Sequence, residues 1–282
     1  MKGLTPGASL NKLLSFEFTT MTWIVGTPTV FGYAILVSDV QVTFTTRSGQ
    51  QQFLDCLQKI YPVSKSMLGG FAGSVKIGFR ILSELQYESS KLGDDQDWDL
   101  ETIANSWWPM VAKEVFGKSE AKERDLGSQV ILAAAHPSQN NGAWPQTDVY
   151  SFSSPDFKPV KANYRQVASI GLPNARYVEA INKVVCNFTF MQSSMAEKFG
   201  PGSMLAFALG RELENFPLEG VSSFFQVGIA SRAKTEINNF IKGVALPDGT
   251  IQEPSFPITA QGLGKFIEIC KVNGIKLEAA IC

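Results

Sequence analysis

The segment TWIVGTPTVFGYAILVSDVQVTF, residues 22–44, decides the fold of this chain. It is dense in β-branched and aromatic residues, which favour strands. Turn-forming residues divide it at 27–29, and others follow it at 47–52. We therefore expect paired strands of a buried sheet.

Further elements follow this segment along the chain. Strands are expected at 57–63 and 67–72, and the second of them ends in the glycine-rich GGFAGS. Apolar residues then recur at three- and four-residue spacings over 75–85, which predicts a helix. A second helix is predicted for 100–116, despite Pro109.

The second half of the chain repeats this order of strands and helices. The expected elements are strands within 129–171, helices from 175 and over 203–215, a final core strand at 222–232 and a short helix at 263–271. Helices thus come in consecutive pairs rather than after every strand. This order favours an α+β fold, a four-layer αββα sandwich of two stacked, mainly antiparallel sheets flanked by helix pairs, over a doubly wound parallel sheet.

The composition argues against several classes of protein. With 25 Lys+Arg against 26 Asp+Glu, the formal net charge of −1 argues against a nucleic-acid partner. The apolar runs are far shorter than the ~20 residues of a membrane span, and polar residues interrupt any secretory signal, so we expect a cytoplasmic protein without a membrane partner. The four cysteines are widely spaced (Cys56, Cys186, Cys270 and Cys282), so we expect no metal site and no disulfide framework.

Common catalytic and cofactor motifs are also missing. The sequence contains no GxxxxGK[ST], no GxGxxG after a strand and no GxSxG, so phosphate-loop, dinucleotide and α/β-hydrolase functions have no support and no cofactor is expected. The lone histidine, His136, ends an apolar strand with nothing beside it that marks a nucleophile. We interpret it as a structural or surface residue rather than a triad base.

The quoted segment, followed by LQKIYPV at 57–63 and LGGFAGS at 68–74, resembles the proteasome β-subunit family. The similarity is strongest to the bacterial proteasome-like peptidase that works with an unfoldase ATPase. Continuous similarity covers 22–85, and looser agreement covers 167–184. The resemblance implies a threonine peptidase whose mature chain begins with its nucleophile.

Carried over residue by residue, the resemblance makes Thr22 the nucleophile and Asp39 the acidic partner. Lys59 becomes the lysine of the site, and the N–H group of Gly70, on a turn, becomes the oxyanion donor. Counting back from the IYP of LQKIYPV instead puts the lysine position at Cys56.

This set of residues is chemically coherent. A threonine hydroxyl is a weak nucleophile, but a free α-amine on Thr22, titrating near pH ~8, could accept its proton. The Lys59 ammonium would keep that amine neutral, and Asp39 would hold the lysine. The mechanism requires that residues 1–21 be absent or removed from the mature protein, as a mis-assigned extension or a propeptide.

The sequence also departs from the family pattern. Leu172 replaces a supporting serine in the motif that reads IGLP here, and an Asp-x-x-Ser pair is matched only approximately by Glu219 and Ser222. We assign Ser222 as a supporting catalytic residue. Leu68 is either a pocket-lining residue that implies apolar specificity or a core leucine.

Three functions are therefore carried forward. The first is a proteasome-like threonine hydrolase that acts on peptides or unfolded proteins, in a homo-oligomeric ring and with a possible AAA+ unfoldase. The second is a small-molecule amidase with the same residues and no ring, and the third is an inactive structural subunit. The expected organisation is an N-terminal extension or propeptide at 1–21, a hydrolase domain at 22–242 and a C-terminal extension at 243–282.

Overall fold

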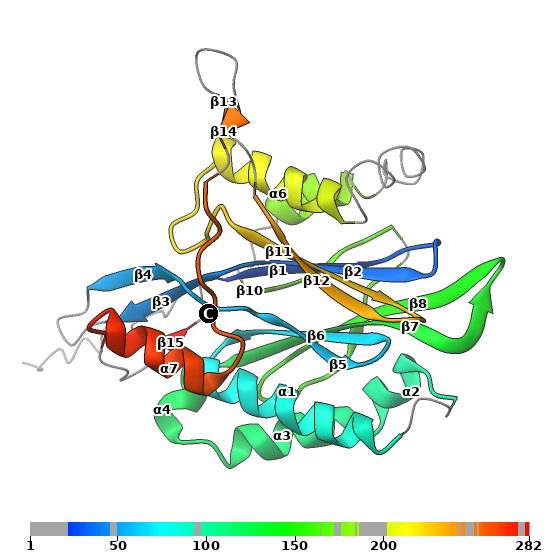
Figure 1. Ribbon diagram of the computed structural model, residues 1–282. Coiled ribbons are helices and arrows are strands. Elements are labelled where there is room, and N and C mark those ends of the chain that lie inside the picture. Colours follow the sequence, from blue (N-terminus) through cyan, green and yellow to red (C-terminus); the bar gives the residue numbers. More distant parts are fainter. Residues whose placement is uncertain are drawn as a thin grey trace, which may run out of the picture.

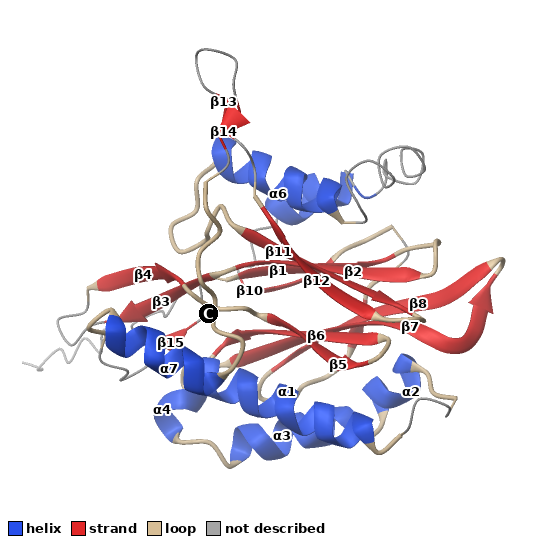
Figure 2. Cartoon of the chain, in the orientation of Figure 1, coloured by secondary structure: helices blue, strands red, loops and turns tan. Residues whose placement is uncertain are grey.

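The structure is a computed structural model with a mixed α+β fold (Figures 1 and 2). It describes residues 22–45, 50–92, 97–163, 165–171, 176–183, 185, 202–241, 244–245, 251–252, 254–275 and 280–281. Within this part of the chain, no helix is both long enough and apolar enough to cross a membrane.

The quoted segment builds the centre of a five-stranded antiparallel sheet with the order β10-β1-β2-β11-β12. Its strands are β1 (Trp23–Pro28), β2 (Tyr33–Asp39), β10 (Ala168–Gly171), β11 (Phe225–Ser231) and β12 (Thr235–Phe240). As expected, β1 and β2 pair with each other, with Val25 opposite Val37. Their apolar runs are continuous because both faces of this sheet are covered.

A second five-stranded antiparallel sheet has the order β5-β6-β7-β8-β9. Its strands are β5 (Ile60–Ser64), β6 (Met67–Gly73), β7 (Ser128–Asn141), β8 (Trp144–Ser153) and β9 (Val160–Lys161). The two sheets lie one over the other (Figure 2). Small and branched side chains fill the space between them, among them Ile24, Leu36, Leu68, Ile131 and Val149.

Helices lie on the outer sides of both sheets (Figure 1). The second sheet is covered by α1 (Val75–Ser90), α2 (Leu100–Asn105), α3 (Trp108–Gly117) and α4 (Ala121–Arg124). The first sheet is covered by α6 (Ser203–Asn215) and by helical backbone at 176–183. The helix α1 begins where predicted, because the Ser74 hydroxyl accepts a hydrogen bond from the Ile77 N–H group at 3.3 Å.

The remaining strands form two smaller sheets. One has the order β15-β3-β4 and consists of β3 (Gln41–Thr45), β4 (Gln51–Asp55) and β15 (Ala280–Ile281). The other pairs β13 (Val244–Ala245) with β14 (Ile251–Gln252). The last helix, α7 (Leu263–Val272), matches the short helix expected at 263–271.

The C-terminal part of the chain joins the body of the fold. The Ala260 N–H group donates to the Cys56 carbonyl at 2.7 Å, and the Gln58 N–H group donates to the Ala260 carbonyl at 3.1 Å. Phe266 of α7 is 1% exposed and stacks on Phe44 with ring centroids 6.1 Å apart. The segment 243–282 therefore contributes to the same core as the strands before it.

Two of the expected elements were wrong in their extent. The helix expected at 100–116 is two helices, and Pro109 lies at the start of α3, where its missing N–H group costs no hydrogen bond. The final core strand expected at 222–232 is β11, which spans only Phe225–Ser231, and a partly exposed strand, β12, follows it and pairs with it. The strand β12 lies at the edge of the sheet, and its mostly polar residues are all partly or fully exposed.

Candidate active site

Three residues chosen from the sequence meet in one buried cluster. The Nζ atom of Lys59 lies 3.0 Å from Oγ1 of Thr22 and 2.9 and 3.0 Å from the two carboxylate oxygens of Asp39. Each of the three residues is 0% exposed. An ammonium group has three hydrogens, so these contacts use the full donor capacity of the lysine. We call Thr22, Asp39 and Lys59 the threonine cluster.

Backbone groups hold the carboxylate of this cluster in place. Asp39 is the last residue of β2, and its Cα lies opposite that of Phe225 in β11. The N–H groups of Trp23 and Gln41 each donate to one of its oxygens at 3.0 Å. Because Trp23 follows Thr22 directly, the carboxylate also fixes the backbone next to the threonine.

The charges of the cluster are balanced internally. Burial raises the pKa of the Asp39 carboxyl, while the Lys59 ammonium and the N–H groups of Trp23 and Gln41 act in the opposite direction. Removing both charges from water is costly unless they are paired and hydrogen-bonded, as they are here. The Thr22 hydroxyl is not needed to neutralise this pair. Its position on the ammonium favours loss of the hydroxyl proton.

Backbone hydrogen bonds hold Lys59 and the residue before it in place. Its carbonyl accepts a hydrogen bond from the Phe71 N–H group at 3.2 Å, and the adjacent Gln58 is bonded to Ala260. The alternative lysine position, Cys56, is 1% exposed and belongs to the core beneath the helices. The structure therefore places Lys59, not Cys56, in the threonine cluster.

Gly171 allows a close backbone approach at Thr22. It lies opposite Trp23 in the pairing of β10 with β1, and its φ of +92° is in the region that favours glycine. A Cβ atom at this position would lie 1.8 Å from the Thr22 carbonyl oxygen. The sequence reasoning did not select this glycine, although it stands in the IGLP motif that drew attention to Leu172.

The expectation that Gly70 lies on a turn is wrong. Gly70 lies within the central strand β6, between Ile60 of β5 and Ile131 of β7. The turn before α1 comes later, at Gly73, whose φ is +93°. Backbone groups inside an interior strand are committed to sheet pairing, and Gly70 has a partner strand on each side. The structure therefore gives no support to Gly70 as an oxyanion donor.

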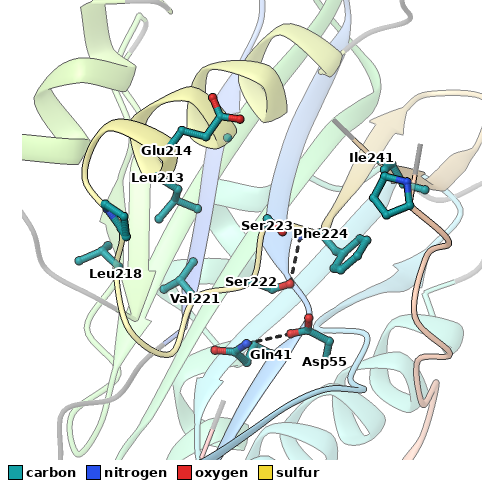
Figure 3. A pocket seen from close by; sticks show the side chains of 13 residues that line it. Gln41, Asp55, Leu213, Glu214, Leu218, Val221, Ser222, Ser223, Phe224 and Ile241 are labelled. Carbon is teal, nitrogen blue, oxygen red and sulfur yellow. Dashed lines mark hydrogen bonds between the residues drawn. The ribbon is translucent and has the colours of Figure 1, made fainter. Parts of the chain in front are cut away.

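Ser222 lies outside the threonine cluster. Its hydroxyl accepts a hydrogen bond from the Phe224 N–H group at 3.0 Å, and it lines a pocket together with Gln41 and Asp55 (Figure 3). Within the described contacts it makes no hydrogen bond with any member of the cluster. The structure does not support its assignment as a catalytic residue.

Three further positions from the family pattern have different outcomes. Leu172, the replacement for the supporting serine, lies outside the described residues, as does the predicted extension 1–21. Glu219 is exposed. Leu68 is 0% exposed and packs between the two sheets, so it is a core leucine rather than a pocket residue.

His136 has a structural role, as expected. It is 4% exposed, and its Nδ1 atom accepts hydrogen bonds from the N–H groups of Ser138 and Gln139 at 3.2 and 2.8 Å. Burial lowers its pKa, against the opposing effect of Asp97 and Asp99. The neutral ring therefore fixes the bend that follows Ala135 in β7.

Comparison with known proteins adds no family assignment. No protein-family model matches this sequence, and no curated protein matches it. The geometry of the threonine cluster is thus the main basis for a functional proposal.

Proposed function

We propose that this protein is a threonine-type N-terminal-nucleophile hydrolase that cleaves peptide bonds through an acyl-enzyme on Thr22. The observation that carries the proposal is the contact of the Lys59 ammonium with both the Thr22 hydroxyl and the Asp39 carboxylate. These residues come from three separate segments of the chain, and no histidine takes part. This is the arrangement that the resemblance to the proteasome β-subunit family implies.

The fold is compatible with the same proposal. Two five-stranded sheets lie one over the other, with helices on the outer side of each (Figure 1). This arrangement supports the four-layer αββα sandwich expected from the order of elements. The resemblance implies a nucleophile at the start of the first strand of the mature chain, and Thr22 directly precedes β1.

The mechanism begins with cleavage of the Met21–Thr22 peptide bond. In the 282-residue chain the Thr22 nitrogen is an amide, which is not a base. After cleavage it becomes an α-amine, and the nearby Lys59 ammonium favours its neutral form. The free amine can then accept the proton of the Thr22 hydroxyl.

The chemical steps then follow the usual course of acyl transfer. The Thr22 oxygen attacks the substrate carbonyl while its proton passes to the α-amine, and the C–N bond of the substrate breaks as that proton is transferred to the leaving amine. Water then attacks the ester on Thr22, with the α-amine as base, which releases the acid. Gly70 and Ser222 have no role in this scheme.

The resemblance supplies the rest of the proposal. The substrates would be peptides or unfolded proteins, the assembly a homo-oligomeric ring, and the location the cytoplasm, with an AAA+ unfoldase as a possible partner. A small-molecule amidase would use the same chemistry without a ring, and the solution mass separates these two cases.

Complete burial of Thr22 favours a second candidate, an inactive structural subunit. In that case residues 1–21 would remain attached, and the threonine cluster would serve only to join segments of the fold. Both candidates predict the same contacts but different N-termini.

The test is the N-terminal residue of protein isolated from its native host, measured by intact mass, together with an assay on apolar fluorogenic peptides. We expect a chain that begins at Thr22, and activity that is lost in Thr22→Ala and reduced at least ~100-fold in Lys59→Met. Thr27→Ala, a change at a buried threonine of β1, the strand that follows Thr22, serves as the matched control and should retain activity.

Two outcomes would reject the hydrolase. Retention of Met21 in an active preparation would exclude the α-amine as base. Equal activity of Thr22→Ala and Thr27→Ala would exclude Thr22 as the nucleophile.

A further inference from the structure

A pocket of about 470 Å³ is lined in part by Gln41, whose N–H group bonds to Asp39 of the threonine cluster, and the proposed mechanism does not use this pocket (Figure 3). Its walls come from the C-terminal end of α6, the loop that leads into β11, and the start of β3 with the end of β4. A pocket of this size falls within the usual range for small organic ligands.

One side of the pocket is polar and carries negative charge. Gln41 and Asp55 are opposite each other in the pairing of β3 with β4, and Gln41 Nε2 donates to Asp55 Oδ1 at 3.0 Å. This leaves Oδ2 of the partly buried Asp55 as an acceptor, and Ser222 adds a hydroxyl that is 3% exposed. Figure 3 shows Asp55 and Ser222 close together at the same side of the pocket.

Most of the remaining lining is an apolar wall. It is lined by side chains from α6, from the loop after it and from the segments beyond β12: Leu213, Leu218, Val221, Phe224 and Ile241. A ligand that fills the pocket must therefore present an apolar body to this wall and a polar group to Asp55.

The charge of the lining selects the sign of that polar group. The lining contains the carboxylate of Asp55, and it contains no lysine, arginine or histidine among the described residues. Asp55 forms no ion pair within the described part of the chain. The C-terminal end of α6, which has the partial negative charge of a helix C-terminus, also faces the pocket, and its last turn contains no basic residue. All three features favour a cation.

The pocket is connected to the threonine cluster through one residue. The Gln41 side chain bonds to Asp55, and the Gln41 N–H group bonds to Oδ2 of Asp39 at 3.0 Å. A ligand that moves the Asp55 carboxylate would therefore also move Gln41, whose N–H group binds Asp39.

We infer that this pocket binds an organic cation, an ammonium or guanidinium group joined to an apolar body, with the charged group on Asp55 and the body against Leu213, Val221 and Phe224. The ligand would be either a small amine or a basic side chain of a peptide. This site goes beyond the proposed hydrolase and does not depend on it, because binding can be measured without turnover.

The test is isothermal titration of the full chain that carries Thr22→Ala, so that no probe is consumed. The probes are 4-phenylbutylamine, its neutral analogue 4-phenylbutanol, and a capped dipeptide amide of leucine and lysine. We expect the amine to bind at least ~10-fold more tightly than the alcohol, because it adds a charge-assisted hydrogen bond. The dipeptide separates the two ligand sources: tighter binding than the amine indicates a peptide, and weaker binding indicates a small amine.

Two added substitutions locate the site. Asp55→Asn keeps the shape and removes the charge, and it should reduce the affinity for the amine ~10-fold or more while leaving the affinity for the alcohol unchanged. Val221→Trp fills the pocket and should weaken the binding of both the amine and the alcohol. Asp156→Asn, at an exposed acid outside the pocket lining, is the matched control and should change neither.

The inference is overturned if the amine and the alcohol bind equally, if neither binds, or if Asp55→Asn behaves like Asp156→Asn. None of these results bears on the hydrolase, which is tested through Thr22 and its N-terminus.

Discussion

At the residue scale, the defining feature of this protein is a lysine that has no access to water. The Lys59 ammonium is surrounded by Thr22 and Asp39, and its charge is balanced by one carboxylate. A buried pair of this kind adds little net stability, but removing one partner leaves an uncompensated charge in the interior. Stability alone therefore does not account for the pair, whereas the proposed hydrolase gives it a role.

This balance gives the first prediction. Lys59→Met should lower the free energy of unfolding by about 3–5 kcal/mol, because Asp39 stays buried without its cation. Urea denaturation followed by tryptophan fluorescence measures the change. The control is Lys118→Met, at an exposed lysine paired with the exposed Glu114, which should cost about 1 kcal/mol or less.

The double variant Asp39→Asn, Lys59→Met should recover part of the loss, since it removes both charges. If Lys59→Met costs no more than Lys118→Met, the buried ion pair does not exist as described.

The second prediction concerns pH and His136, the one histidine in the sequence. Burial lowers its pKa in the folded protein, so the folded state favours the neutral ring. Stability is then complete above the unfolded pKa of about 6.5 and falls as the pH drops below it, because the unfolded chain takes up the proton first.

Unfolding in urea at pH 7.5, 6.5 and 5.5 tests this dependence. His136→Asn keeps an acceptor oxygen near the N–H groups of Ser138 and Gln139 but cannot titrate, so its stability should change less over this range. If the stability of the wild-type protein and that of His136→Asn depend on pH in the same way, His136 is not the cause of the pH dependence.

At the element scale, the contact between α1 and the second sheet depends on a glycine. A Cβ atom on Gly78 would lie 2.1 Å from the ring of Phe71, which is 0% exposed in β6. The helix thus approaches the sheet closely only because Gly78 has no side chain.

The third prediction follows from this close approach. Gly78→Ala should destabilise the protein by about 1–3 kcal/mol through overpacking, despite the better helix propensity of alanine. Gly117→Ala, in α3, meets nothing within 4 Å and should be neutral or stabilising by up to about 1 kcal/mol. Thermal unfolding of the two variants makes the comparison, and equal effects would rule out the packing argument.

At the scale of the whole molecule, the C-terminal segment completes the structure that holds the threonine cluster. Ala260 bonds to Cys56 and Gln58 on the segment that leads to Lys59, and α7 packs on the core formed with α1. The N-terminal and C-terminal parts of the chain therefore share one core.

The fourth prediction tests this sharing. Phe266→Ala should lower the free energy of unfolding by about 3–5 kcal/mol, because a buried aromatic ring leaves a cavity against Phe44. Val272→Ala, at a residue of the same helix that is 81% exposed, should change it by about 0.5 kcal/mol or less. If Phe266→Ala lowers the free energy of unfolding no more than Val272→Ala does, α7 does not contribute to the shared core.

Local patterns in the sequence were sufficient for much of this structure. The apolar run at 22–44 predicted β1 and β2, and three- and four-residue spacings over 75–85 predicted α1, because burial of one face imposes a period on the chain. The resemblance selected Thr22, Asp39 and Lys59 before any contact between them was known. These are properties that neighbouring residues or a motif can carry.

Only the tertiary structure decided how distant segments meet. It placed Lys59 rather than Cys56 on Thr22, moved Gly70 from a turn into β6, and put Ser222 in a pocket with Asp55. It also brought the Trp23 and Gln41 N–H groups to the Asp39 carboxylate. No sequence pattern marks this contact, because every residue other than proline has a backbone N–H group. Register, close approach and burial arise from packing between segments far apart in the chain, so only the folded chain could fix them.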